Sequence, residues 1–171
     1  NFSKNISGVL NVGGDLTITS VNALNVGEIR VAGNITSSDT SVGGNSQITL
    51  NGTGTQTISG DDLSDGKLNI DKTSGTAILA DDLVLNGTLQ GLNVISGTLD
   101  LNGHTINATG EVVVNDSVLT GDGTITNDLT IEDDAIIRLS ASSTSVYESI
   151  VVGGTFTLGL GAQLELDLTG M

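Results

Sequence analysis

The sequence lacks cysteine, proline and tryptophan, and its 171 residues include only three aromatic side chains, Phe2, Tyr147 and Phe156. Without cysteine, neither disulfides nor thiolate metal sites can hold the fold together. Without proline, every backbone N–H group is available for sheet hydrogen bonding. The scarcity of aromatic rings argues against a wide two-layer sandwich, because rings usually fill the space of about 10 Å between its sheets. These absences indicate a narrow interior filled by Leu, Ile and Val.

Positive charge is also scarce, with five basic residues against twenty acidic ones and a formal net charge of −15. Such a surface repels phosphate backbones and anionic membranes, so nucleic acid is excluded as a partner. No apolar run is long enough to cross a bilayer, and we expect no membrane insertion by this segment. The acidic surface suits a solvated exterior, and it also suits bridging by divalent cations.

A five-residue phrase recurs along the chain. It consists of an apolar residue, any residue, a second apolar residue, any residue and a glycine. Its six copies cover residues 10–14, 29–33, 48–52, 83–87, 99–103 and 150–154. The first three copies start 19 residues apart, and the fourth and fifth start 16 apart. These intervals are typical of one coil of a β-solenoid rather than of a helical repeat. We therefore expect the copies to stack on one another in successive coils.

Strand geometry explains the phrase. Side chains alternate between faces, so Leu99 and Leu101 point one way and Asp100 points the other. Asn102 and Gly103 then allow a sharp bend at positive φ. Asn-Gly is also the strongest short hairpin signal, so antiparallel hairpins are the alternative. The short, uneven flanks and the nearly constant early interval favour parallel coils, and no segment has helical periodicity.

The sequence thus predicts an all-β fold, a right-handed parallel β-helix of about eight to nine coils. It forms a single elongated domain over residues 1–171, either a segment of a longer chain or a subunit that stacks end to end. With a rise of about 4.8 Å per coil the rod is roughly 40 Å long. Its ends expose unpaired strand edges that must be capped or continued. We expect longer loops at 36–45 and 140–145.

Acidic residues supply the candidate sites. Asp61, Asp62 and Asp65 place three carboxylates within five residues, which suits calcium, although the EF-hand spacing and the calcium-binding nonapeptide are absent. The alternative is that they are solvated corner residues. Adjacent residues on a strand point to opposite faces, so the pairs 81–82 and 133–134 do not form catalytic pairs. We expect no catalytic residue and no enzymatic activity.

The remaining candidates have simple structural interpretations. His104 follows a corner glycine and is expected to be an exposed turn residue, while Arg30 and Arg138 are expected to point outward without an evident partner.

Thr-x-Thr steps suggest a flat ligand such as ice, but they do not recur at one coil position, and the preference of strands for β-branched residues explains them. Four of the glycosylation sequons lie at Asn34, Asn51, Asn86 and Asn107.

About a third of the chain resembles repeats of bacterial surface proteins. Residues 147–168, "YESIVVGGTFTLG" followed by "AQLELDL", resemble autotransporter passenger repeats, and residues 54–60, 68–89 and 96–106 are similar to repeats of large secreted adhesins. The pattern departs at Gly159-Leu160-Gly161, which interrupts the usual paired glycines, and neither a translocator barrel nor a secretion motif is present. The resemblance implies export to the cell exterior and a structural or adhesive role.

The functional hypothesis is a rigid shaft, adhesin or assembly module at the cell surface. Its partner would be a cell-surface or polysaccharide ligand, or another copy bound end to end. One alternative is a carbohydrate-binding or carbohydrate-active β-helix, which needs several carboxylates or bases converging in one groove. Another is a calcium-ordered surface-layer or filament subunit.

Overall fold

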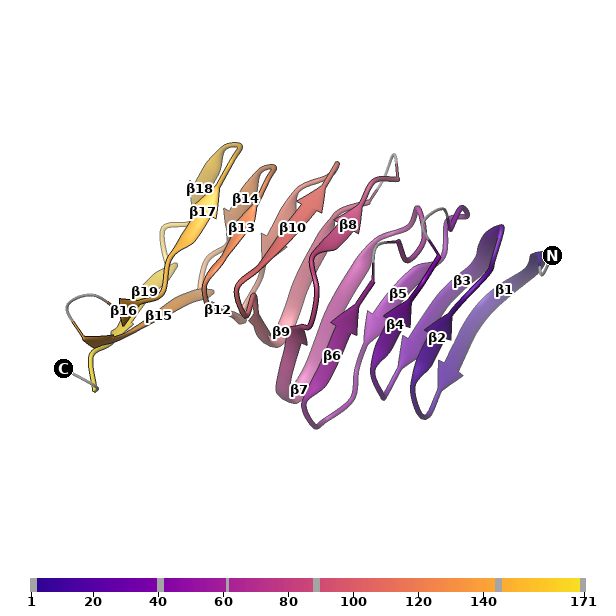
Figure 1. Ribbon diagram of the computed structural model, residues 1–171, viewed down its shortest axis with the longest axis horizontal. Coiled ribbons are helices and arrows are strands. Elements are labelled where there is room, and N and C mark those ends of the chain that lie inside the picture. The colour runs from indigo at the N-terminus through magenta and orange to yellow at the C-terminus, as the bar shows by residue number, and fades with distance from the viewer. Residues whose placement is uncertain (1–2, 40–41, 61, 88–89, 144–145, 170–171) are drawn as a thin grey trace.

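The strands of this protein stack along one long axis, as Figure 1 shows. The computed structural model describes residues 3–39, 42–60, 62–87, 90–143 and 146–169. These residues form nineteen strands and no helix. The prediction of an all-β solenoid is confirmed.

Two sides run along the whole stack of coils, and a third sheet is added in the later coils. The first side consists of β1 (Ser3–Val12), β3 (Ala23–Val31), β5 (Gln47–Leu50), β7 (Leu68–Leu79), β9 (Leu92–Asp100), β11 (Val112–Val114), β14 (Leu129–Ile131) and β18 (Phe156–Leu158). The second side consists of β2 (Leu16–Ile18), β4 (Ile35–Ser37), β6 (Gln56–Ser59), the later parts of β7 and β9, and then β12 (Val118–Thr120), β15 (Ile136–Ser143) and β19 (Gln163–Asp167). The third side is a separate sheet of β8 (Leu83–Leu85), β10 (His104–Ala108), β13 (Gly123–Ile125) and β17 (Ile150–Val152).

Equivalent residues of successive coils lie in register and form columns. One interior column on the first side runs through Leu10, Ile29, Ile48, Leu68, Leu92, Val112, Leu129 and Phe156. Its six middle members are at most 2% exposed. Apart from β15 with β16 (Val146–Tyr147), all strand pairs in the described part of the chain are parallel. The hairpin alternative is therefore wrong for the solenoid itself.

The copies of the repeated phrase do not all stack on one another, which corrects the sequence-based expectation. The first three lie on the first side, but Leu83 and Ile150 begin strands of the third side, and Leu99 lies in the later part of β9 on the second side. The physical reason is that every side of a coil ends in a corner. Two inward apolar residues followed by a glycine can form the end of any of the three sides, because each side packs inward and then turns.

The number of turns is also slightly lower than expected. The chain makes six to seven turns instead of eight to nine coils. The expectation assumed coils of nearly constant length, but paired residues are 19 apart at Leu10 and Ile29 and 27 apart at Leu129 and Phe156. The longest coil contains the pair β15 and β16, which extends beyond the regular winding.

Glycine serves the corners in two different ways. At the corner of residues 102–103, Asn102 has φ 50° and Gly103 has φ 84°, as the sequence predicts. Gly52, which also follows an asparagine, has no positive φ, but a Cβ there would lie 2.1 Å from the Ala32 carbonyl oxygen. Glycine at this corner is therefore required by the close approach of the neighbouring coil rather than by a left-handed backbone.

The two predicted loops are shorter than expected. Residues 140–143 belong to β15 and pair with β16, while Thr144 and Ser145 lie outside the described residues. Thr36 and Ser37 belong to β4, and an irregular segment begins at residue 38. Runs of serine and threonine suggested loops, but backbone pairing with the adjacent strand keeps these residues extended.

Neighbouring valines of β11 provide a test of the interior columns. Val114 is fully buried, whereas Val113 is half-buried and points to the outer face. We expect Val114→Ala to lower the free energy of unfolding by about 2 kcal/mol through lost burial and a residual cavity. Val113→Ala, the same chemical change one residue away, should cost less than half as much. Urea denaturation of both variants measures this difference, and equal losses would contradict the assigned faces.

Candidate functional site: corner carboxylates and the edge of the last coil

Aspartates at the corners link one coil to the next. The Oδ1 atoms of Asp15, Asp82 and Asp128 accept hydrogen bonds from the backbone N–H groups of Asn34, Thr105 and Thr155, over N···O distances of 2.7, 2.8 and 2.7 Å. Asp122 and Asp133 bond Ser149 and Gly161 in the same way. In each case the carboxylate belongs to one coil and the N–H group to the following one. Five of the twenty acidic residues therefore link one coil to the next.

The predicted calcium site is only partly described. Asp61 lies outside the described residues, whereas Asp62 is 4% exposed and Asp65 is half-buried beside it. Asp62 Oδ2 accepts a hydrogen bond from Val42 N at 2.9 Å, and its buried Oδ1 has no partner among the described residues. Within that part of the chain, no three His, Cys, Asp or Glu side chains are arranged to hold a metal. Calcium binding here stays a prediction that depends on Asp61.

The environment of Asp62 raises the pKa of its carboxyl group. Burial raises the pKa of this carboxyl, and the nearby charges of Asp65 and Asp39 raise it further, against hydrogen bonds from Val42 and Leu63 that lower it. The ionised form of Asp62 is therefore less favourable in the folded protein than in the unfolded chain.

His104 and the two arginines all have partners. His104 Nδ1 lies 3.5 Å from Asp82 Oδ1, the oxygen that also accepts the Thr105 N–H group, so the histidine belongs to a corner rather than to a free turn. The expectation that Arg30 and Arg138 lack partners was wrong. Arg30 pairs with Glu28 of its own strand at 3.0 Å, and Arg138 pairs with Glu165 of the following coil at 2.7 Å.

Sequence reasoning missed a buried lysine. Lys72 is 1% exposed, and its Nζ donates hydrogen bonds to Gly52 O at 2.6 Å and to Gln56 Oε1 at 2.5 Å. Gln56 Nε2 in turn donates to Val31 O at 3.1 Å. Burial lowers the pKa of the Lys72 amine. The signal was present in the alternation, since Leu68, Ile70 and Lys72 occupy the same inward phase of β7.

Threonines do not form a continuous array on the first or the second side of the described residues. On the second side Thr17 stacks on Thr36, but the next residue of that column is Ser59. The outward column of the first side is mixed and consists of Asn11, Arg30, Thr49, Asn69, Asn93, Val113, Thr130 and Thr157. This irregularity agrees with the interpretation of the threonines as ordinary strand residues.

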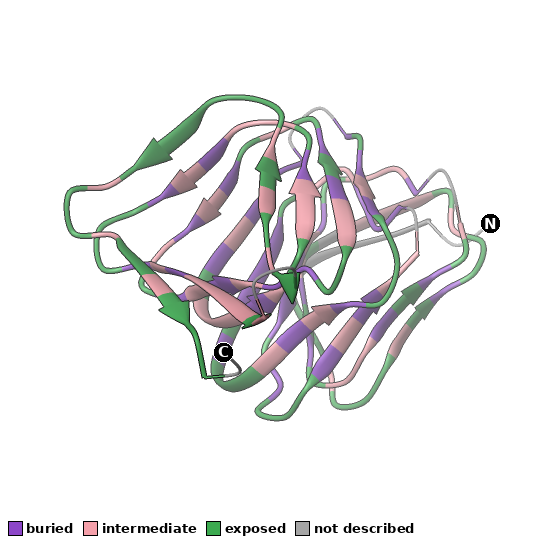
Figure 2. Ribbon diagram, turned by 60° about the vertical axis from the view of Figure 1, so that its left-hand side comes forward, coloured by how far each residue is buried: buried purple, intermediate pink, exposed green. Residues whose placement is uncertain are grey.

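The last described coil carries most of the exposed apolar surface. Phe156, Leu158 and Leu164 are 49%, 54% and 63% exposed, although they occupy inward positions of the columns. Figure 2 shows β18 exposed throughout, in contrast to the buried interior of the coils beneath it. A hollow of about 360 Å³ opens there, lined by eight apolar side chains and by Gln163.

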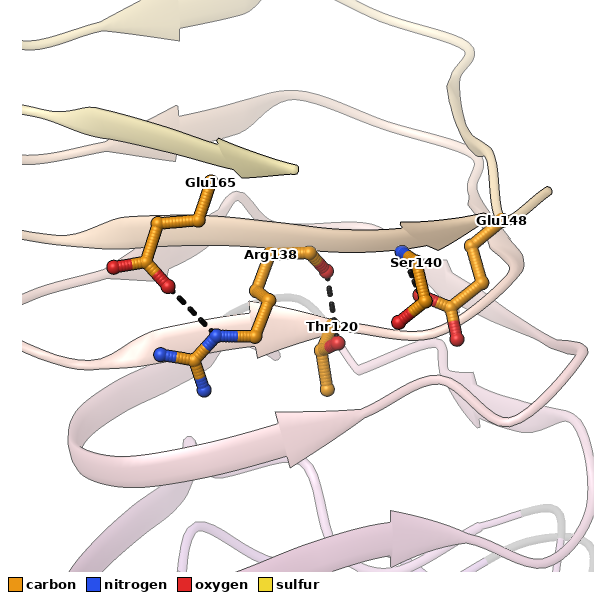
Figure 3. A network of polar contacts seen from close by, with 5 residues as sticks. All are labelled: Thr120, Arg138, Ser140, Glu148 and Glu165. Carbon is orange, nitrogen blue, oxygen red and sulfur yellow. Dashed lines mark hydrogen bonds and ion pairs between the residues drawn. The ribbon is translucent and has the colours of Figure 1, made fainter. Parts of the chain in front are cut away.

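A polar network fastens the side of this coil. As Figure 3 shows, Arg138 Nε donates to Glu165 Oε2 at 2.7 Å, and the Arg138 carbonyl oxygen accepts a hydrogen bond from Thr120 Oγ1 at 2.8 Å. Two residues further along β15, the Ser140 N–H group donates to Glu148 Oε2 at 2.8 Å. These contacts join β12, β15 and β19, and they stabilise this side of the last described coil.

Comparison with known proteins gives no relative, since no family, no curated protein and no solved structure matches this chain. No helix in the described part of the chain is both long and apolar enough to cross a membrane.

The adjacent aspartates 81 and 82 test the structural role of corner carboxylates. Both are exposed, but only Asp82 accepts a backbone hydrogen bond from the next coil within the described structure. We expect Asp82→Ala to lower the free energy of unfolding by about 0.5–1 kcal/mol and Asp82→Asn to restore most of it, because an amide oxygen also accepts this bond. Asp81→Ala should have little effect. Equal losses at 81 and 82 in urea denaturation would contradict this role.

Asp62 should make stability depend on pH. Because the pKa of Asp62 is raised in the folded state, the folded chain holds this proton more tightly than the unfolded chain does. Wild-type protein should therefore gain stability relative to Asp62→Asn as the pH falls from 7 toward the usual range of an aspartate. Urea denaturation of both proteins at pH 7 and at about pH 4.5 measures the change. A change in the opposite direction would contradict the burial of an ionisable Asp62.

Proposed function

We propose that this chain is a structural module of an extracellular surface protein, a rigid solenoid shaft without catalytic activity. The observation that supports this most directly is the bonding between coils. Interior columns of Leu, Ile and Val continue from coil to coil, and corner carboxylates add hydrogen bonds across the same interfaces. Bending such a rod separates strands on one side, which breaks backbone pairs and opens the aliphatic interior at once.

The extracellular location rests on two sequence features. The resemblance of residues 147–168 to autotransporter passenger repeats favours export, and a net charge of −15 suits a surface that is exposed to solvent and to salt. Cysteine-free solenoids also need no redox chemistry to fold, so stability comes entirely from packing and pairing.

A carbohydrate-active function is the main competitor, and one observation speaks for it. The His104 imidazole and the Asp82 carboxylate form a pair at an exposed corner, which is the kind of acid and base that such chemistry uses. Asp82 Oδ1 already accepts the Thr105 N–H group, which favours the structural role. Turnover of polysaccharides that disappears in Asp82→Asn and His104→Gln, or in the combined replacement of Asp61, Asp62 and Asp65, would overturn our proposal.

A calcium-ordered module is the second competitor, and chelation separates it from a metal-independent shaft. Calcium bound near Asp62 would make the melting temperature fall by more than a few degrees when EDTA is added, because a ligand that binds only the folded state stabilises it. A metal-independent shaft should show the same melting temperature with EDTA and with added calcium.

Rigidity can be measured directly because the chain has no native cysteine. Asn11 and Thr157 are exposed and lie at opposite ends of one outward column, which crosses eight strands of the first side. Spin labels on the double variant Asn11→Cys/Thr157→Cys should give one narrow distance distribution, centred at roughly 30–35 Å for parallel strands about 4.8 Å apart. Dilute protein keeps the measurement within one molecule. A broad distribution would contradict a rigid shaft.

A further inference from the structure

The interior of β7 contains a lysine that has no acidic partner. Lys72 is 1% exposed, and no carboxylate pairs with it within the described residues. Its Nζ donates hydrogen bonds to two neutral groups, the Gly52 carbonyl and the Gln56 carboxamide. A buried ammonium without a counter-charge costs free energy. A neutral amine avoids this cost, and so does an amide made from that amine.

Gln56 presents its carboxamide carbon to the Lys72 amine. Gln56 is also 1% exposed, and its Oε1 lies 2.5 Å from Lys72 Nζ. Because a C=O bond is about 1.23 Å long, Nζ lies no farther than about 3.7 Å from Gln56 Cδ. Reacting atoms typically approach to about 3–3.5 Å before a bond forms between them. The amine and the carboxamide carbon are therefore held near reacting distance, away from solvent.

Hydrogen bonds fix the orientation of the Gln56 carboxamide. The Gly52 N–H group donates to Oε1 at 2.9 Å, and this is the oxygen that faces the amine. Such a donor polarises the carbonyl and stabilises the negative charge that develops on Oε1 when Cδ is attacked. Nε2 donates to Val31 O at 3.1 Å and to Gly33 O. The two ends of the carboxamide are thus held apart, with the oxygen beside the amine.

Gln90 shows the same corner without the amine. It is 1% exposed, and its Oε1 accepts a hydrogen bond from the Gly87 N–H group at 2.7 Å, as Gln56 Oε1 does from Gly52. Both glycines follow an asparagine. No lysine donates a hydrogen bond to Gln90 in the described part of the chain. A buried glutamine therefore closes such a corner by itself, and the corner does not require Lys72.

We propose that Lys72 and Gln56 form an intramolecular isopeptide bond. The neutral Nζ attacks Cδ and forms the Nζ–Cδ bond, one proton of the amine transfers to Nε2, and the Cδ–Nε2 bond breaks to release ammonia. No electron transfer and no co-reactant is needed. Burial lowers the pKa of the Lys72 amine, which enlarges the neutral fraction that carries the attacking lone pair.

The bond would join two successive coils covalently. Gln56 lies in β6 and Lys72 lies in β7, and these strands belong to adjacent coils and pair in parallel. Separating the two coils would then require breaking an amide bond as well as the strand pairing. This inference goes beyond the proposed shaft and does not depend on it, because the chemistry needs only the buried pair.

Mass spectrometry tests the proposal on the whole chain. Folded protein, after prolonged incubation in mildly alkaline buffer, should contain a species that is lighter by one ammonia molecule. Its proteolytic digest should contain a branched peptide that links Lys72 to Gln56. Lys72→Met and Gln56→Met should each abolish this species, because each removes one reacting group. Lys67→Met, which removes an exposed lysine five residues away, should leave the yield unchanged.

A second reaction with the same mass change has to be distinguished. Asparagine followed by glycine can cyclise to a succinimide, which also releases ammonia, and the chain has such pairs at 51–52, 86–87 and 102–103. Hydroxylamine cleaves the chain at a succinimide but leaves an isopeptide bond intact. A loss of ammonia that persists in Lys72→Met, or that hydroxylamine converts into chain cleavage, would therefore overturn the proposal.

A wild-type chain that keeps its full mass after incubation, with no branched peptide in the digest, would overturn it as well. Circular dichroism checks that each variant is folded. If Lys72→Met does not fold, the branched peptide of the wild-type digest decides the question alone, since its fragment spectrum identifies both linked residues.

Discussion

The structure depends on parallel pairing between successive coils over a continuous aliphatic interior. Each strand of the first side bonds to the strand one coil before and one coil after, and the residues in register have the same inward or outward orientation. Burial of Leu, Ile and Val and satisfaction of backbone hydrogen bonds therefore occur at the same interface. A coil on its own would bury little, so stability belongs to pairs of neighbours.

The stacking of coils gives several of the aspartates a structural role. Corners interrupt the regular ladder and leave backbone N–H groups that need acceptors. Aspartate is short enough to reach the adjacent coil from a corner, and Asp15, Asp82 and Asp128 all do so. The carboxylates are spaced along the stack at separate corners. This distribution provides links between successive coils.

Two of the buried polar side chains, Lys72 and Asp62, differ in how well their hydrogen-bonding groups are satisfied. The Lys72 amine donates to Gly52 and Gln56, so its burial is accompanied by hydrogen bonds although no carboxylate pairs with it. Asp62 has one bonded oxygen and one buried oxygen without a partner in the described structure. Unsatisfied buried groups cost stability, and Asp62 shares this cost with Asn69, whose buried Oδ1 also has no partner among the described residues.

The sequence by itself determined the fold class, because strand alternation, glycine corners and the lack of aromatic rings are local properties of the chain. It also placed Leu99 and Leu101 on the inner face, and both are fully buried. Tertiary structure alone decided which side of the coil each phrase occupies, since the same apolar pair and glycine fit any corner. It also decided that Glu165 is the partner of Arg138 and that Asp82 bonds Thr105, because the coil lengths that set these contacts between coils vary along the chain.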